Sequence, residues 1–304
     1  MKRVSIITVN FNQSLVTEQL LNSIDLTNTY PDIEIVVVDN GSAANSVPEW
    51  TVKFPNVVFI RSEQNLGFAG GNNIGIIPST GEYLFLVNND TEFTPGLIQT
   101  LVTILDEHPE VGMVCPKIRY FDQPDMLQYM GFTNMNYYTA RNNSIGQFET
   151  DKGQYDNLTG ATGYAHGAAM MVKRECIEKA GLMAENYFLY YEELDWCDRI
   201  KKAGYQIWLV TAALIYHKES VSVGKVSALK EYFMNRNRIL FIRRNAPALA
   251  RLVFYAFFIL VVTPRNIIKY ITTGHADFIK WLFKAIWWNI TQKKDSTYLG
   301  YPLK

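Results

Sequence analysis

Residues 4–9 of the chain read VSIITV, a continuous apolar run that is rich in β-branched side chains. Such a run predicts a strand that is buried on both faces, as strands of a parallel sheet are. A second run of this kind, IEIVVV at 33–38, ends in Asp39 and a turn-forming Asn-Gly-Ser. Between the two runs, residues 14–24 carry apolar side chains at helical spacing. The chain therefore opens as strand, helix and strand, which predicts an α/β fold.

The same alternation continues along most of the chain. We expect further strands at 57–60, 83–87, 112–115, 168–172 and 207–216. We expect further helices at 68–77, 95–107, 174–180 and 192–202, with Pro95 in the first turn of one and Gly204 closing another. This order predicts a Rossmann-like, mostly parallel sheet with flanking helices. Residues 122–159 have weak periodicity, so we expect irregular loops and small antiparallel pieces there.

Composition narrows the class of protein. The 304 residues include 29 basic and 29 acidic side chains, so the chain lacks the positive charge that a nucleic-acid partner requires. Its three cysteines are odd in number and form no C-x-x-C pair, which argues against a disulfide framework or a zinc site. Residues 1–10 lack the long apolar core and cleavage site of a signal peptide. We therefore expect a cytoplasmic protein.

The last part of the chain has a different composition. Residues 252–263 read LVFYAFFILVVT, and residues 278–290 combine four aromatic side chains of Trp and Phe at 281–288 with two lysines. The first stretch is shorter than the roughly 20 apolar residues of a bilayer span. One interpretation is a helix packed on the catalytic domain. The other, which we favour, is helices lying on the inner face of the cell membrane. We expect a catalytic domain at 1–220, divided at 120/121, and a helical, membrane-associating segment at 221–304.

Polar residues follow three of the predicted strands, at the edge of the sheet where α/β proteins bind ligands. Thr8 and Asn10 end the first strand, Asp39 the second, and Asn88-Asn89-Asp90 the fourth. Asp39 is suited to a nucleobase or ribose, or else simply to a turn. Asp90 is a hard oxygen ligand of the kind that Mg²⁺ or Mn²⁺ bound to a diphosphate takes, or else part of a polar turn.

A second set of polar residues comes later in the chain. Glu192, Glu193 and Asp195 begin a helix directly after the aromatic run at 187–191. Carboxylates there stabilise the helix dipole, but one that lies against aromatic rings also gains proton affinity, as a general base requires. His217 follows an apolar strand, where a histidine is as often a buried structural residue as a metal ligand.

These signals coincide in a family resemblance that covers about residues 4–245. The chain resembles inverting family-two glycosyltransferases of the GT-A fold, in particular the rhamnosyltransferase and galactofuranosyltransferase branch. The matching strings are VSIITVNFNQ (4–13), VVVDNGS (36–42), NLGFAGGNNIGI (65–76), YLFLVNND (83–90), GAAMMVKRECIEKAGL (167–182), YFLYYEELDWCDRIKKAGY (187–205) and YH (216–217).

The resemblance implies a role for each matching residue. The nucleoside would be held by Thr8, Asn10 and Asp39. The donor pocket would be lined by Asn65, Gly67, Gly70, Gly71, Asn72 and Asn89, with the glycine pair admitting a phosphate or sugar close to the backbone. Asp90 and His217 would hold Mg²⁺ or Mn²⁺, and Glu193 would be the catalytic base. The chain departs from the family at Asn88, where Asp is expected, and at Glu193, where Asp is commoner, so Glu192 and Asp195 stay open as alternatives.

The sequence thus predicts transfer of a sugar, best guessed as L-rhamnose from dTDP-rhamnose, to a saccharide acceptor. The apolar C-terminal stretches favour a lipid-linked acceptor, as in the biosynthesis of a cell-surface polysaccharide. Other expected donors are galactofuranose, GlcNAc and glucose. A nucleotidyltransferase is disfavoured, because TVNFNQ replaces its basic glycine-rich loop. A non-catalytic sugar-binding protein of the same fold is the alternative from another class, and the retained acids argue against it.

Overall fold

The computed structural model describes residues 1–219 and 227–303. These residues form one ten-stranded sheet in the order β3-β2-β1-β4-β9-β6-β10-β5, with β7 added beside β6 and β8 beside β10. The strands are β1 Val4–Asn10, β2 Ile33–Asn40, β3 Val57–Ser62, β4 Tyr83–Asn88, β5 Thr91–Phe93, β6 Val111–Tyr120, β7 Leu127–Tyr129, β8 Gly160–Ala161, β9 Ala169–Lys173 and β10 Gln206–His217.

The sheet has a parallel half and a mixed half. Strands β3, β2, β1 and β4 are all parallel, as their continuous apolar sequences predict. Strand β9 then runs antiparallel between β4 and β6, and β5 runs antiparallel to β10. The expectation of a mostly parallel sheet therefore holds for the first half, whereas the second half reverses direction three times, between β4 and β9, between β9 and β6 and between β10 and β5. Buried strands of either direction have the same apolar pattern, so the sequence did not indicate these reversals.

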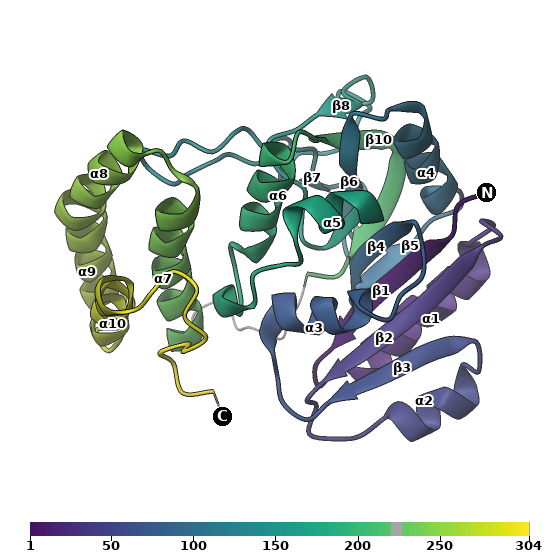
Figure 1. Cartoon of the computed structure of the whole chain (residues 1–304), viewed down its shortest axis with the longest axis horizontal. Helices are drawn as coiled ribbons and strands as arrows, with labels where there is room; N and C mark the ends of the chain where they lie inside the picture. Colours follow the sequence, from purple (N-terminus) through teal and green to yellow (C-terminus); the bar gives the residue numbers. More distant parts are fainter. Residues whose placement is uncertain (220–226, 304) are drawn as a thin grey trace.

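Helices cover both faces of the sheet, and a separate group of helices stands to one side (Figure 1). They are α1 Ser14–Thr27, α2 Val47–Lys53, α3 Gly67–Ile76, α4 Leu97–Glu107, α5 Arg174–Ala180, α6 Glu192–Lys202, α7 Ala228–Asn245, α8 Ala248–Phe257, α9 Thr263–Thr272 and α10 Phe278–Thr291. The predicted bounds of α5 and α6 are confirmed. The prediction for α4 was wrong by two residues, because Gly96 turns left-handed (φ 78°) between Pro95 and the first helical residue.

The C-terminal helices differ most from expectation. Helices α8 and α9 are joined by a π-helical turn, Phe258–Val262, into one helix of 25 residues, Ala248–Thr272. The inference that this apolar stretch is too short for a bilayer was therefore wrong, because the helix continues past Pro264. By length and composition it is a candidate membrane-associating helix, and 28% of its most apolar window is buried.

The expected boundary between residues 220 and 221 lies outside the described residues. On its C-terminal side, α7 packs against α6 and against α10 (Figure 1). Its side chains Tyr232, Phe233, Leu240 and Phe241 are fully buried. Helix α7 is therefore part of a hydrophobic core that the sheet shares with the C-terminal helices, and the predicted division into two domains stays a prediction.

Candidate active site

The register of two short antiparallel strands brings Asp90 and His217 together. Asp90 lies between β4 and β5, and β5 pairs with the end of β10 so that Thr91 is opposite His217. His217 Nε2 lies 3.1 Å from Asp90 Oδ1. Asp90 is 4% exposed, and within the described residues neither of its carboxylate oxygens accepts a hydrogen bond. A buried carboxylate in this state is costly unless a cation or proton joins it.

Gln128 of β7 fixes the orientation of the His217 ring. Its amide oxygen lies 2.8 Å from His217 Nδ1, and an amide oxygen only accepts, so Nδ1 carries the hydrogen. With Nδ1 directed at Gln128, Nε2 is the nitrogen that faces the Asp90 carboxylate. A divalent cation at this position would take Nε2 and a carboxylate oxygen of Asp90 as ligands. An imidazole that donates its second nitrogen to an acceptor is the usual arrangement of a metal-bound histidine.

The two side chains fit a cation that is shared with substrate. Within residues 1–219 and 227–303, no group of three His, Cys, Asp or Glu side chains is placed to hold a metal by itself. Mg²⁺ commonly takes one or two protein carboxylates and completes its shell with water and substrate phosphates. The Asn88 amide nitrogen lies 3.5 Å from His217 Nε2 and borders the same position.

A second histidine, His166, stands next to this pair and was not singled out from the sequence. Its ring centroid lies 6.1 Å from that of His217, in an edge-to-face arrangement. Its Nδ1 accepts a hydrogen bond from the backbone N–H of Ala168 at 3.1 Å. Burial, together with the neighbouring His217, lowers the pKa of His166 to about 3, so its imidazole is neutral. The only sequence signal was its place just before the matching string at 167–182.

Glu193 approaches the same region from the first turn of α6. A Cβ built on Gly167, the residue after His166, would lie 3.9 Å from Glu193 Cγ and 3.8 Å from the ring of Phe68. Burial raises the pKa of the Glu193 carboxyl. A partly exposed carboxylate with raised proton affinity has the property that the sequence predicted for a general base.

The two alternative acids have other environments. Asp195 is fully buried, and its oxygens accept from the Tyr187 hydroxyl at 3.1 Å, from Asn245 at 2.8 Å and from Arg199 at 2.8 Å. With both oxygens engaged, Asp195 is a structural residue, and its candidacy as the base is not supported. Glu192 is 3% exposed, and burial, with the neighbouring Glu193 charge, raises the pKa of its carboxyl well above the usual range.

The loop before these acids has an unusual backbone. Phe188, Tyr190 and Tyr191 have φ values of 66°, 71° and 74°, in the left-handed region that side chains with a Cβ disfavour. One side chain of α7 holds this loop: Asn237 Nδ2 donates to the carbonyl oxygens of Tyr187, Leu189 and Tyr190 at 2.8–2.9 Å. Strained backbone of this kind persists where the surrounding structure fixes it, and often at functional sites.

The residues predicted to hold the nucleoside make hydrogen bonds and ion pairs within the protein. Asp39 is fully buried, and its oxygens accept from Asn10 at 3.0 Å and from Arg61, which also donates to Ser42 O at 2.8 Å. Asn10 further accepts from Thr17 at 3.0 Å. Arg61 was not predicted, yet its guanidinium is 31% exposed and closes the carboxyl end of β2 and β3. Thr8 is also fully buried, and within the described residues its hydroxyl has no partner.

The glycine-rich segment allows close packing within the protein. Cβ atoms on Gly70 and Gly71 would lie 2.6 Å from Leu66 Cβ and 2.8 Å from a methyl carbon of Val9. The glycines therefore let α3 pack closely on Leu66 and on β1, and the approach of a phosphate or sugar to them stays a prediction. At Gly67, φ is 73° and a Cβ would meet the carbonyl of Phe188 at 2.0 Å, so this glycine joins the segment to the strained loop.

The amides of this region also support the structure. Asn65 Oδ1 accepts from Gly67 N at 2.8 Å, and Asn72 Nδ2 donates to Phe68 O at 2.9 Å. Asn89 turns away from the Asp90 carboxylate and donates to Thr17 of α1 at 3.0 Å. Asn72 and Asn89 are both buried, and their amide groups donate hydrogen bonds within the protein. Their predicted place in the lining of a donor pocket stays a prediction.

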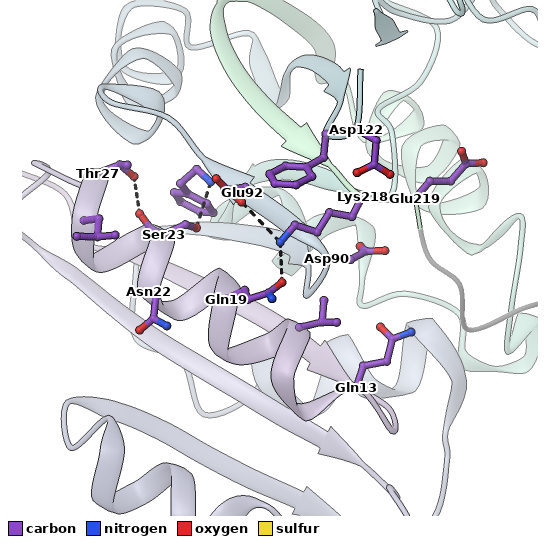
Figure 2. Close-up of a pocket in the computed structure, with 14 residues that line it drawn as sticks. Gln13, Gln19, Asn22, Ser23, Thr27, Asp90, Glu92, Asp122, Lys218 and Glu219 are labelled. Carbon is purple, nitrogen blue, oxygen red and sulfur yellow. Dashed lines mark hydrogen bonds and ion pairs between the residues drawn. The ribbon is translucent and has the colours of Figure 1, made fainter. Parts of the chain in front are cut away.

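A groove of about 660 Å³ runs along α1 and ends at Asp90 (Figure 2). Lys218 reaches across it, donating to Gln19 at 2.8 Å and pairing with Glu92 at 3.6 Å. Of the predicted site residues, all of which lie in the described part of the chain, Asp90 alone lines this groove. A smaller cavity of about 200 Å³ adjoins it beside His217. The Asp90–His217 pair is thus bordered by open space.

With this geometry established, comparison with known proteins decides the family. The family model described as "Glycosyl transferase family 2" matches residues 5–180, more than half of the chain. The chain belongs to glycosyl transferase family 2. It is a glycosyltransferase with the GT-A fold, as the resemblance implied, and the match includes Asp39 and Asp90 but ends before Glu193 and His217.

Two curated relatives of this family 2 enzyme have names that state an activity. The low-salt glycan biosynthesis hexosyltransferase Agl10 of Haloferax volcanii is 28% identical over 228 residues, 71% of this chain and 70% of that one. The N-acetylglucosaminyl-diphospho-decaprenol L-rhamnosyltransferase of Mycobacterium tuberculosis is 23% identical over 240 residues, 72% of this chain and 77% of that one. The first name describes a hexosyltransferase of glycan biosynthesis and the second an L-rhamnosyltransferase.

A solved structure shares the fold. The mannosyltransferase PcManGT from Pyrobaculum calidifontis, in complex with GDP-Man and Mn²⁺, superposes with a TM-score of 0.57 at 15% identity. The alignment covers 95% of this chain and 87% of that one. The C-terminal helices are therefore included in the shared length, and the likeness at this identity concerns the fold.

Proposed function

We propose that this family 2 enzyme transfers a hexose with inversion from a nucleotide sugar to a lipid-linked saccharide, using a divalent cation. The observation that carries the proposal is the buried contact between Asp90 and His217, with Glu193 lying against Gly167, the residue after the neighbouring His166. L-rhamnose from dTDP-rhamnose is the proposed donor, since a curated relative is named an L-rhamnosyltransferase. Galactofuranose, GlcNAc and glucose are the alternatives.

The residues divide the chemistry between them. Glu193 takes the proton of the acceptor hydroxyl as that oxygen bonds to the anomeric carbon from the face opposite the diphosphate. The bond between the anomeric carbon and the diphosphate oxygen breaks, and its electrons leave with the nucleoside diphosphate. Mg²⁺ or Mn²⁺, held by Asp90 and His217, would neutralise charge on that leaving group. Gln128 keeps His217 in the orientation in which Nε2 faces the cation.

The test is release of nucleoside diphosphate from a panel of dTDP-, UDP- and GDP-sugars, with Mn²⁺ and with EDTA. We expect Mn²⁺-dependent release with one nucleotide sugar, and its loss in Asp90→Ala. Thermal-shift measurements on the same panel give donor binding independently of turnover. If no nucleotide sugar binds or is cleaved, the alternative of a non-catalytic sugar-binding protein is favoured.

We also propose that the enzyme is held at the inner face of the membrane through its C-terminal helices. The apolar side chains that these helices expose are Leu249, Leu252, Val253, Ile259, Leu260, Val261, Ile268, Ile271, Phe283, Trp287 and Ile290. Residues 246–294 contain seven basic side chains and one acidic one, Asp277. An apolar surface with this charge balance is complementary to an anionic lipid surface.

Vesicle flotation tests this attachment without removing a helix, since α10 packs on α7 and deleting it would expose the core. Replacing Leu252, Leu260 and Trp287 by Gln should abolish flotation with anionic vesicles. Replacing Leu15 and Leu26, exposed apolar residues of α1, is the matched control and should leave flotation unchanged. An alkaline carbonate wash should release the wild-type protein, and retention would mean that helix 248–272 spans the bilayer.

A further inference from the structure

Three arginines from distant segments gather where the catalytic half meets the C-terminal helices. Arg238 lies on α7, and its guanidinium carbon is 6.0 Å and 5.8 Å from the ring centroids of Phe254 and Phe258. Arg141 belongs to the extended segment 132–144, which reaches across to α8 (Figure 1). Its guanidinium carbon is 6.0 Å from the ring of Phe257, on the same helix. Arg265 follows Phe258 by two helical turns.

Within the described residues, none of the three guanidinium groups forms an ion pair with a carboxylate, so no negative side chain there balances their positive charges. Arg238 Nε is buried and, among those residues, has no hydrogen-bond partner, although the same side chain donates to Thr139 O. Burial lowers the pKa of Arg238, and the charges of Arg141 and Arg265 act in the same direction. Charges concentrated in this way are stabilised by a bound anion.

The arginines lie between the catalytic base and the exposed apolar helix. Tyr191 lies two residues before Glu193 and packs against Phe241, with 5.8 Å between the ring centroids. Burial raises the pKa of its hydroxyl, and the positive charges of Arg238 and Arg141 act in the opposite direction. On the other side, the helix that carries Phe254 and Phe258 also exposes Leu252 and Leu260. An anion bound here has the base on one side and the apolar surface on the other.

We propose that Arg141, Arg238 and Arg265 bind the phosphate groups that join the saccharide of the acceptor to its lipid. Guanidinium groups bind phosphate oxygens through paired hydrogen bonds, and three of them more than neutralise the two negative charges of a diphosphate diester. Bound in this way, the acceptor presents its sugar hydroxyl toward Glu193 while its lipid lies along the exposed face of α8 and α9. The inference rests on the proposed function, because it assigns the acceptor of that same reaction.

The experiment uses the full chain and farnesyl diphosphate as the probe, with EDTA present to prevent metal-dependent binding at the donor site. Binding is measured by titration calorimetry in wild type and in Arg141→Gln/Arg265→Gln, two exposed positions at which folding is not at risk. We expect the double variant to bind at least about tenfold more weakly. Lys269→Gln, which removes an exposed charge one turn from Arg265, is the matched control and should bind as wild type does.

Two further probes identify the source of the phosphate, and a third separates this inference from the proposed function. Farnesol should bind much more weakly than farnesyl diphosphate, and so should inorganic diphosphate. Equal binding of either one, or equal loss in Lys269→Gln, would overturn the inference. Donor binding with Mn²⁺ should be unchanged in the double variant. If wild type binds the nucleotide sugar but the double variant keeps its affinity for farnesyl diphosphate, the inference alone fails.

Discussion

Replacing Asn237 by Ala should disable the catalytic loop although Asn237 itself lies on α7. Its amide nitrogen makes hydrogen bonds of 2.9, 2.8 and 2.8 Å to three carbonyl oxygens of residues 187–190, and the side chain is fully buried. A hydrogen bond in a protein contributes about 1 kcal/mol net, and a carbonyl left buried without a partner costs more. We therefore expect the free energy of unfolding to fall by about 3 kcal/mol.

Turnover should fall as well, for a separate reason. Phe188, Tyr190 and Tyr191 each hold a left-handed backbone that costs on the order of 1–3 kcal/mol. Once Asn237 is removed, the loop is expected to relax toward ordinary backbone angles and to shift Glu193. Under conditions where the variant is fully folded, kcat should fall about tenfold or more while KM for the donor stays within about twofold, since misplacing a reacting group by about 1 Å is this costly.

The assay combines urea unfolding, followed by tryptophan fluorescence, with steady-state kinetics in buffer. Asn235→Ala is the matched control: Asn235 is a buried amide of the same helix, but it donates to Glu231 O at 2.7 Å within α7. That variant should lose stability and keep its kcat. A variant Asn237→Ala with wild-type kcat would refute the reasoning, because the loop would then be held without its amide.

Four further substitutions test the site. Asp90→Ala should abolish Mn²⁺-dependent turnover and weaken donor binding measured by thermal shift, whereas near-normal Mn²⁺-dependent activity would exclude it as a ligand. Glu193→Gln should keep donor binding and cut kcat about 100-fold or more. Glu192→Gln should be far milder, and a larger effect there would transfer the role of base to Glu192. Because burial raises the pKa of Glu192 above 4.5, the native state holds a proton that the unfolded chain releases, and stability falls as pH rises above that value. Glu192→Gln should therefore unfold at higher urea than wild type at pH 8 but not at pH 4, and equal midpoints at pH 8 would contradict its burial. Gln128→Ala should weaken Mn²⁺ binding about tenfold, measured by electron paramagnetic resonance of the protein without substrate, because His217 loses its orienting partner.

The parallel half of the sheet could be predicted because buried strands have a recognisable sequence pattern, a run of apolar and β-branched residues. Residues 4–9 and 33–38 are mostly apolar and β-branched, and both form fully paired strands. Strand β5 has no such pattern, since Thr91–Phe93 is three residues long and looks like a turn before Pro95. Yet the pairing of β5 with β10 is what places His217 beside Asp90. The resemblance indicated both residues, whereas the contact between them depends on a register that sequence periodicity does not contain.

The physical roles within the site were harder to predict than the residues. Gly70 and Gly71 were singled out because glycine admits close approach, and the approach is real, but the neighbours are Leu66 and Val9. Asp39 was expected to face a nucleoside, and its partner Arg61 lies at the same level on the adjacent strand β3. Residue type indicates which kinds of neighbour a position can accept. The order of the strands decides which neighbour lies there, and that order depends on the sequence of the whole sheet.

Helix α7 explains why a boundary before it does not separate catalysis from the C-terminal helices. Three side chains of this helix have different partners: Asn237 holds the loop before Glu193, Arg238 lies over the rings of Phe254 and Phe258, and Asn235 accepts a hydrogen bond from Asn266 of α9 at 3.2 Å. The apolar surface and the catalytic base are thus attached to opposite sides of one rigid element. A helix is rigid along its length because its backbone hydrogen bonds are internal, so two groups attached to it keep a fixed separation. Anchoring α8 and α9 at a lipid surface would therefore fix the distance of Glu193 from that surface, which is what an enzyme acting on a lipid-linked sugar requires.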